Sequence, residues 1–348
     1  MLVERIEAKW IEAFAATFTL CGVEAGDVCA VLSETQSRRV NVELSDLALQ
    51  SLGAKVFHIQ IPTPRQTAPV AIRSTGASDA IGGIEPVIAA LGSSVLVADC
   101  TVEGLLHALE LPAILRGGTR ILMVSNEHPE LLERLVPEPA LEAKVKAGTK
   151  LLKAADTMTV TSPGGTDLSI DVSKAPAGSS WGYTSKPGTI AHWPGGLCLC
   201  FPAAGSVNGT LVLDRGDVNL TFKRYVESPI RCTIENDYIV DISGEGLDTE
   251  LMKSYFDAWN DPDAYAVSHV GWGMNPAARW DALAMYDKTQ VNGTELRAFG
   301  GNFLYSTGAN EVAGRYTLGH FDLPMRGCSV ALDGSPVVVD GILQGDLA

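Results

Sequence analysis

The chain has 348 residues, 46% of them hydrophobic, with 35 glycines and 18 prolines. Such a chain can bury a large core and is long for one domain, so we expect two domains. Its net charge is -15, and its 26 Lys and Arg residues form no dense run. Because phosphate binding needs a basic patch, this excludes nucleic acid as an expected partner and favours a small molecule.

The first residues, "MLVERIEAKWIEAF", carry glutamates among apolar positions, whereas a secretory signal needs a basic start and an unbroken apolar run. No later stretch is apolar over the length that a membrane helix requires. We therefore expect a cytoplasmic protein without a membrane span. The seven cysteines include no C-x-x-C pair, which predicts buried thiols rather than disulfides or a zinc ribbon.

Helical and extended patterns alternate along the first half of the chain. Helices are expected near 3–20, 40–52, 83–91 and 138–154, and strands near 27–33, 54–62, 94–100 and 119–125. This alternation predicts a doubly wound, mostly parallel sheet, which we place in an α/β domain over residues 1–154. No nucleotide-binding glycine motif occurs there, so this domain is expected to be a scaffold or the contact region of a homo-oligomer.

From about residue 155 the pattern changes to short β runs separated by Gly, Asn and Asp. Three dipeptides are of the kind preferred in two-residue hairpin turns: Asn208-Gly209, Asn292-Gly293 and Asp333-Gly334. One helix is expected at about 248–259. These features predict a largely antiparallel, β-rich domain over residues 155–348.

Near the end of the chain, "TLGHFDLPMRGC" places His320 and Asp322 on either side of one residue. On a strand both side chains would point to the same face, about 7 Å apart at Cα, and could bind one metal ion. The alternative is a His–Asp hydrogen bond that fixes the tautomer of the ring. A metal would need a third ligand from upstream, since no histidine follows Asp322. This order differs from 2-oxoglutarate oxygenases, where the third histidine follows the H-x-D.

His269, on a glycine-rich turn in "YAVSHVGWGMNP", is the best candidate for that third ligand. Two histidines and one carboxylate leave coordination positions open and suit Fe(II) that holds substrate and O2 together. Two other histidines are candidates for the site. His107 follows the strand that ends at Cys100, near the carboxyl edge where ligands of such sheets collect, although it also fits a packed helix. His192 lies among Trp, Gly and Pro in "TIAHWPGGLC".

Four longer segments carry a family resemblance: "GTLVLDRGDVNLTFKRY" (209–225), "SHVGWGMNPAARW" (268–280), "RAFGGNFLYSTG" (297–308) and "GHFDLPMRGCSVALD" (319–333). The chain resembles the 2,5-dihydroxypyridine 5,6-dioxygenases, mononuclear non-haem iron enzymes that share their fold with the M29 thermophilic aminopeptidases. The resemblance implies an Fe(II)-dependent, extradiol-type dioxygenase. It would open 2,5-dihydroxypyridine, or a close hydroxylated N-heteroaromatic ring, between C5 and C6 with O2 to give N-formylmaleamate.

The resemblance also implies a set of site residues. It assigns the iron to His269, His320 and Asp322, in agreement with the triad chosen from the residues. It assigns His107 and His192 to acid–base catalysis and Arg297 and Ser306 to the substrate.

The chain departs from the family at Ser180, where the family has an acidic residue, and at Gly300, where it has an aromatic one. Ser180 is kept as a candidate substrate-binding residue, and either change would alter the ring that is accepted. Two other functions stay open: an M29-like metallo-aminopeptidase that activates water instead of O2, and a non-catalytic binding protein in which His320 and Asp322 only pair.

Overall fold

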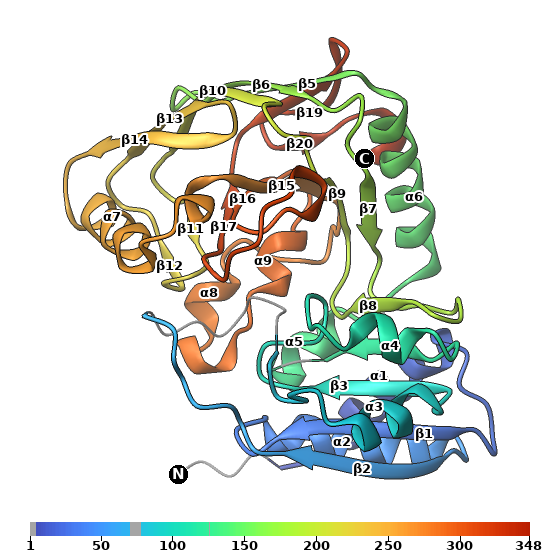
Figure 1. Cartoon of the computed structure of the whole chain (residues 1–348). Helices are drawn as coiled ribbons and strands as arrows, with labels where there is room; N and C mark the ends of the chain where they lie inside the picture. Colours follow the sequence, from blue (N-terminus) through green and yellow to red (C-terminus); the bar gives the residue numbers. More distant parts are fainter. Residues whose placement is uncertain (1–4, 70–77, 125) are drawn as a thin grey trace.

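The computed structural model describes residues 5–69, 78–124 and 126–348. A parallel sheet forms the N-terminal half, with strand order β2-β1-β3-β4-β8 (Figure 1). Its strands are β1 (Val28–Glu34), β2 (Lys55–Ile61), β3 (Leu96–Cys100), β4 (Arg120–Met123) and β8 (Ile190–His192). The inner strand β3 is buried at every position, as expected where helices cover both faces of a parallel sheet.

Helices pack on both faces of this sheet. One face carries α1 (Ala8–Leu20), α2 (Arg39–Ser51) and α5 (Pro129–Arg134), and the other carries α3 (Glu85–Gly92) and α4 (Leu111–Leu115). The doubly wound architecture predicted for this half is therefore confirmed. Strand β8 comes from beyond residue 154 and completes the sheet beside β4, so the chain returns to its first half after entering the second.

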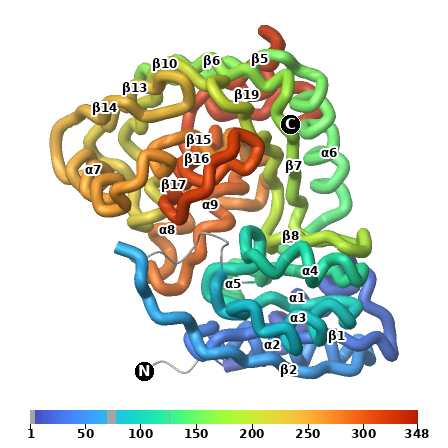
Figure 2. Tube along the Cα trace, in the orientation of Figure 1, coloured from blue at the N-terminus to red at the C-terminus, as the bar shows by residue number. Residues whose placement is uncertain are grey.

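An eight-stranded and a five-stranded antiparallel sheet form most of the remaining β structure that is described (Figure 2). The larger has the order β14-β13-β10-β6-β5-β18-β19-β20. Its strands in chain order are β5 (Thr157–Thr161), β6 (Asp167–Asp171), β10 (Val207–Leu213), β13 (Ile230–Glu235), β14 (Tyr238–Gly244), β18 (Ser329–Leu332), β19 (Ser335–Val339) and β20 (Ile342–Leu343).

The smaller sheet has the order β17-β16-β15-β9-β7. Its strands are β7 (Ala177–Ser180), β9 (Leu197–Cys200), β15 (Val267–Gly273), β16 (Phe303–Thr307) and β17 (Phe321–Met325). The largest core cluster joins the inner faces of both antiparallel sheets to α6 (Pro139–Ala154) and α7 (Leu247–Trp259). The largely antiparallel second half is thus confirmed.

Short elements complete this half. They are β11 (Val218–Asn219) and β12 (Arg224–Tyr225), the helices α8 (Ala282–Met285) and α9 (Thr294–Ala298), and the 3-10 turns η1 (Pro262–Tyr265), η2 (Lys288–Gln290), η3 (Glu311–Ala313) and η4 (Gly345–Leu347). Each helix of the described segments is too short or too polar to cross a bilayer.

Only one of the three turn dipeptides forms the expected hairpin. Asp333-Gly334 joins β18 to β19, with both residues at positive φ. Asn208-Gly209 instead lies inside β10, where a Cβ on Gly209 would come 2.2 Å from the Asp167 carbonyl oxygen. This glycine permits a close approach of two strands and does not form a turn. Asn292-Gly293 precedes α9 and not a strand, with Gly293 at the helix N-cap.

Candidate active site

Three adjacent strands bring the predicted residues together. Ser306 of β16 lies directly opposite Asp322 of β17. On the other side of β16, the register with β15 shifts by one residue between Val267 and Val270, so that Ser268 and His269 both lie opposite Ser306. His269 is therefore in a buried strand with a β-bulge, and its prediction on a turn was wrong. Such a bulge redirects side chains, and here it turns His269 toward Ser306 and Asp322.

The carboxylate of Asp322 lies at the centre of the cluster. Its Oδ1 is 3.3 Å from Nε2 of His320 and 3.6 Å from Nε2 of His269. Its Oδ2 accepts a hydrogen bond from Nε of Arg297 at 2.6 Å. Ser306 Oγ donates to Oδ1 and lies 2.9 Å from Nε2 of His269. The expected convergence of His320 and Asp322 on one face is thus observed, with His320 immediately before β17.

Each ring nitrogen of His269 lies against a serine hydroxyl. Ser268 Oγ donates its single hydrogen to the carbonyl oxygen of Ala309, and the same Oγ lies 3.2 Å from Nδ1 of His269. Ser306 Oγ, whose hydrogen goes to Asp322, faces Nε2 of the same ring at 2.9 Å. A neutral imidazole has one N–H, so only one of the two serines accepts from it, and metal binding at Nε2 requires the hydrogen on Nδ1, toward Ser268. In that tautomer the lone pair of Nε2 faces the carboxylate of Asp322, as two ligands of one cation do.

The charges of the site agree with this assignment. Burial alone would raise the pKa of Asp322, but the positive charge of Arg297, followed by His320, holds it well below its usual value. Burial lowers the pKa of His269 to about 3, against the opposing effect of Asp322. At neutral pH the site thus holds an ionised carboxylate and a neutral imidazole. These are the forms that bind metal ions.

The residues fit a metal by the chemistry of their side chains, although their atoms are engaged with one another. In the part of the chain that the structure describes, no group of three or more His, Cys, Asp or Glu side chains is placed so that it could hold a metal ion without rearrangement. Both oxygens of Asp322 accept hydrogen bonds, Oδ2 from Arg297 and Oδ1 from Ser306. Two donors at neighbouring positions of one ion, each about 2.1 Å from it, lie about 3 Å apart. The observed separations of 3.3 and 3.6 Å are slightly larger.

His107 and His192 approach the cluster from the carboxyl edge of the parallel sheet. His107 lies in a turn between β3 and α4, so it is not a packed helix residue. The residue is exposed, and desolvation by its surroundings together with the nearby His320 lowers its pKa to about 4. His192 ends β8, and its Nδ1 lies 2.8 Å from the carbonyl oxygen of Pro194.

The remaining candidates occupy different places. Ser180, at the end of β7, donates a 3.4 Å hydrogen bond to the carbonyl oxygen of His192, so it is next to the site. A Cβ on Gly300 would meet Asn275 and Leu343 at ordinary contact distances, so a side chain there has room. Arg297, predicted to bind substrate, contacts Asp322. Ser306 likewise contacts two of the predicted metal ligands.

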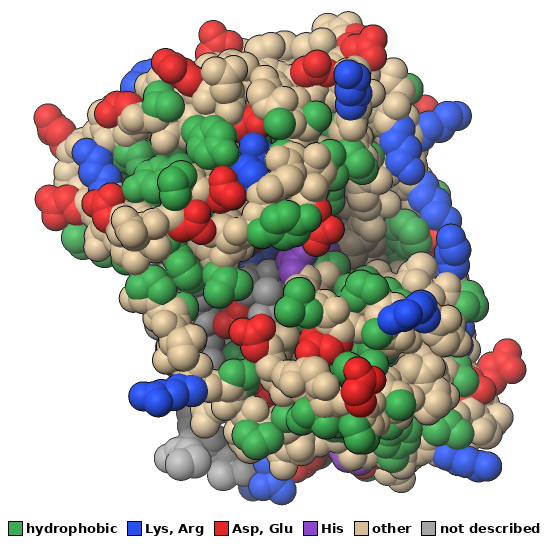
Figure 3. Space-filling view, viewed as in Figure 1, with side chains coloured by type: hydrophobic (Ala, Val, Ile, Leu, Met, Phe, Trp, Pro, Cys, Tyr) green, Lys and Arg blue, Asp and Glu red, His purple; other side chains and the backbone are tan. Residues whose placement is uncertain are grey.

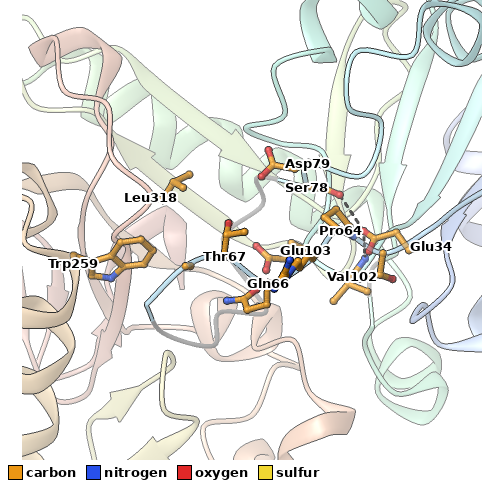
Figure 4. A pocket seen from close by; sticks show the side chains of 13 residues that line it. Glu34, Pro64, Gln66, Thr67, Ser78, Asp79, Val102, Glu103, Trp259 and Leu318 are labelled. Atoms are coloured by element: carbon orange, nitrogen blue, oxygen red, sulfur yellow. Dashed lines mark hydrogen bonds between the residues drawn. The ribbon is translucent and has the colours of Figure 1, made fainter.

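A cavity of about 100 Å³ lies between the two halves of the molecule (Figure 4). Figure 4 shows Trp259 and Leu318 on one side and Glu34, Val102 and Glu103 on the other. Leu318 is two residues before His320, and Glu103 is four residues before His107. The surface is hollowed between the halves, and a histidine is visible there (Figure 3).

Sequence reasoning missed two residues that support the histidines. Ser268 is adjacent to His269 in the chain. Had His269 been predicted on a strand with a bulge and not on a turn, Ser268 would have been expected beside its ring. Tyr255 Oη bonds to the main chain of His320 from a helix 65 residues earlier. No spacing in the sequence marks that contact.

Solved structures with the same fold are known. The AmpT structure from Thermus thermophilus matches with a TM-score of 0.66 and 15% identity, over 97% of this chain and 99% of that chain. The structure of 2,5-dihydroxypyridine dioxygenase from Pseudomonas putida KT2440 matches with a TM-score of 0.92 and 36% identity, over 98% and 99% of the two chains. The expected M29 aminopeptidase-like fold is therefore confirmed.

The sequence comparisons agree with the second of these structures. A curated 2,5-dihydroxypyridine 5,6-dioxygenase from Pseudomonas putida strain KT2440 is 37% identical over 338 residues, 96% of this chain and 95% of that protein. The fold and these relatives define a ring-cleaving dioxygenase built on an aminopeptidase-like fold. The family model described as 2,5-dihydroxypyridine 5,6-dioxygenase matches residues 9–345, and the chain belongs to this family. The resemblance inferred from the sequence is confirmed.

Proposed function

We propose that this dioxygenase opens 2,5-dihydroxypyridine, or a close hydroxylated N-heteroaromatic ring, between C5 and C6 to give N-formylmaleamate. We further propose that it uses one Fe(II) held by His269, His320 and Asp322. The single observation that carries the metal assignment is the convergence of Nε2 of His269 and Nε2 of His320 on Oδ1 of Asp322, at 3.6 and 3.3 Å. Bound there, Fe(II) would supply the path for electrons between the ring and O2. The ring gains both atoms of O2 and loses none, so no external reductant is needed.

His192 is proposed as the base that takes the proton of the substrate hydroxyl. A carbonyl oxygen can only accept, so the contact with Pro194 requires a hydrogen on Nδ1 of His192. The neutral ring then carries its lone pair on Nε2, where it can accept a proton. Burial lowers the pKa of His192, which keeps this neutral form populated at pH 7. The protonated His192 is proposed to give this proton back as the ring opens, and His107, at the other side of the cluster, is proposed to relay it.

Arg297 is proposed to act on both the site and the substrate. Its contact with Asp322 holds that carboxylate in its ionised form. An anionic oxygen of the substrate would be a second partner for the same guanidinium by charge-assisted hydrogen bonding. Ser180 and Gly300 are proposed to set which ring enters, since Ser180 contacts His192 and Gly300 leaves room for a side chain.

Oxygen labelling tests the proposal. Protein reconstituted anaerobically with Fe(II) should take up one O2 per ring opened, and both labelled oxygen atoms should appear in the product by mass spectrometry. As matched controls, His269→Ala, His320→Ala and Asp322→Ala should each lose stoichiometric iron while folded. One labelled atom would indicate a monooxygenase, and retained iron in all three variants would refute the triad.

Two other functions have distinct outcomes in the same assay. Release of amino acids from peptides without O2 uptake would indicate a metallo-aminopeptidase. The lower identity of 15% with AmpT, against 36% with the dioxygenase structure, favours the dioxygenase. Absence of both metal binding and turnover would indicate a binding protein with a structural His–Asp pair. In solution, we also propose that the chain forms a homo-oligomer.

A further inference from the structure

One side chain fixes the main chain of a proposed metal ligand from both sides. Tyr255 Oη accepts a hydrogen bond from the backbone N–H of His320 at 2.8 Å. The same hydroxyl donates to the backbone carbonyl oxygen of His320 at 2.7 Å. Both main-chain polar groups of His320 thus share one phenolic oxygen. The proposed function assigns no role to this pair of hydrogen bonds.

The place of His320 in the sheet explains why such a contact is needed. Pairing between β16 and β17 begins with Thr307 opposite Phe321, so His320 lies one residue before the ladder. Its N–H and carbonyl oxygen have no strand partner in that ladder. A polar backbone group near the core needs a partner, and Tyr255 supplies one for each group. Thr221 Oγ1 adds a longer hydrogen bond to the same carbonyl oxygen, at 3.3 Å.

The ring of Tyr255 is held rigidly, so the hydroxyl has a defined position. The residue is 1% exposed in α7. Its ring meets Phe321 edge to face at a centroid distance of 4.1 Å, and it also contacts Phe222, Phe256 and Trp259 at 5.7 to 6.1 Å. Aromatic packing on several sides leaves the ring little freedom to turn. The position of α7 is thereby transmitted to the backbone of His320.

We propose that Tyr255 is a positioning residue that sets the orientation of the His320 imidazole toward the metal. This inference rests on the proposed function, in which His320 is a ligand. Residues that orient metal ligands typically contribute about 10- to 100-fold to metal affinity or activity. Because Tyr255 acts through the main chain, its effect should appear in metal binding even without substrate.

The test is Tyr255→Phe, which removes only the hydroxyl and keeps the aromatic packing. Tyr265→Phe is the matched control, because Tyr265 stacks on Phe256 in the same cluster and its hydroxyl bonds to Asp257 instead. The probe is Co(II) alone, titrated into the metal-free full-length chain and followed by its visible absorption. Tyr255→Phe should bind Co(II) about 10- to 100-fold more weakly than the wild type, and Tyr265→Phe should match the wild type.

The outcomes separate this inference from the proposed function. If the wild type binds Co(II), His320→Ala does not, and Tyr255→Phe binds as tightly as the wild type, only the positioning role is refuted. If the wild type does not bind Co(II), the proposed metal site fails and the inference with it. If Tyr255→Phe does not fold, the hydrogen bond from the His320 amide to Tyr255 is tested by hydrogen exchange of that amide in the wild type. Protection supports the contact, and exchange at the rate of a free amide refutes it.

Discussion

At the scale of single residues, the site is organised around one buried carboxylate. Asp322 is 4% exposed, and burial of a charge is costly unless partners compensate for it. Arg297 and Ser306 are those partners, through Oδ2 and Oδ1 respectively. Arg297 therefore stabilises the fold and the ionised form of the ligand at once. Its predicted contact with substrate would add to this role.

Replacing Arg297 by Met should be strongly destabilising, because it leaves a buried charge unpaired. We expect a loss of about 3 to 5 kcal/mol in the free energy of unfolding. The control is Arg279→Met, which removes a solvent-exposed pair with Asp281 and should cost at most about 1 kcal/mol. Urea denaturation measures both values. In folded Arg297→Met, kcat/KM should also fall about tenfold to a hundredfold. Equal stability of the two variants would show that the Arg297–Asp322 pair does not stabilise the fold.

The pH profile should report His192, whose pKa is lowered from 6.5 by burial. A base must be neutral, so kcat/KM should be constant above pH 6.5 and fall only at lower pH. His192→Gln should have low activity and lose this acid limb, whereas His58→Gln, on the surface beside Asp46, should keep it. If the acid limb of the pH profile were unchanged in His192→Gln, a residue other than His192 would be the base.

Protonation of His192 also changes the stability of the fold. The unfolded chain binds the proton more readily than the native state because the native pKa of His192 is lowered. The contribution of this residue to the free energy of unfolding is therefore fully present above pH 6.5 and is lost as the pH falls below that value.

At the scale of elements, short segments bring Arg297 to the strands. Helix α9 has only five residues, too few to be stable alone. Its first turn is held by Glu127 from the N-terminal half, whose carboxylate accepts from the N–H groups of Asn292 and Thr294 at 2.9 and 2.8 Å. Arg134 of α5 further clamps Glu295 of this helix with two hydrogen bonds.

Replacing Glu127 by Gln should loosen α9, because an amide offers one acceptor where two N–H groups require two. Hydrogen bonds to a charged group are worth about 1.5 to 3 kcal/mol, and we expect a loss of that size in the free energy of unfolding. Glu130→Gln, an exposed change in α5, should stay within about 0.5 kcal/mol. Thermal and urea unfolding provide the comparison. A neutral Glu127→Gln would mean that α9 is held by Arg134 alone.

At the scale of the whole molecule, the site depends on both halves. His107 and His192 come from the carboxyl edge of the parallel sheet, and His269, His320 and Asp322 come from the smaller antiparallel sheet. Strand β8 ties the halves together because it belongs to the first sheet by pairing and to the second half by sequence. The cavity has walls from both halves. The boundary near residue 154 stays a prediction.

The sequence alone determined the features that depend on local order along the chain. Alternating helical and extended patterns predicted the parallel sheet, and the helix at 248–259 was found as Leu247–Trp259. His320 and Asp322 were paired correctly because side chains two residues apart share a face of an extended segment. His269 was reached by elimination and resemblance, not by any local pattern, and it lies in the predicted cluster.

Only the tertiary structure decided how distant residues meet. The bulge in β15 turns His269 toward Ser306, and its position depends on the register with β16, which no local pattern encodes. The dipeptide Asn208-Gly209 has the composition of a turn, yet its neighbouring strands hold it extended. Tyr255 and Arg297 reach His320 and Asp322 through contacts 65 and 25 residues apart. Such contacts depend on packing, because burial leaves each polar group with few available partners.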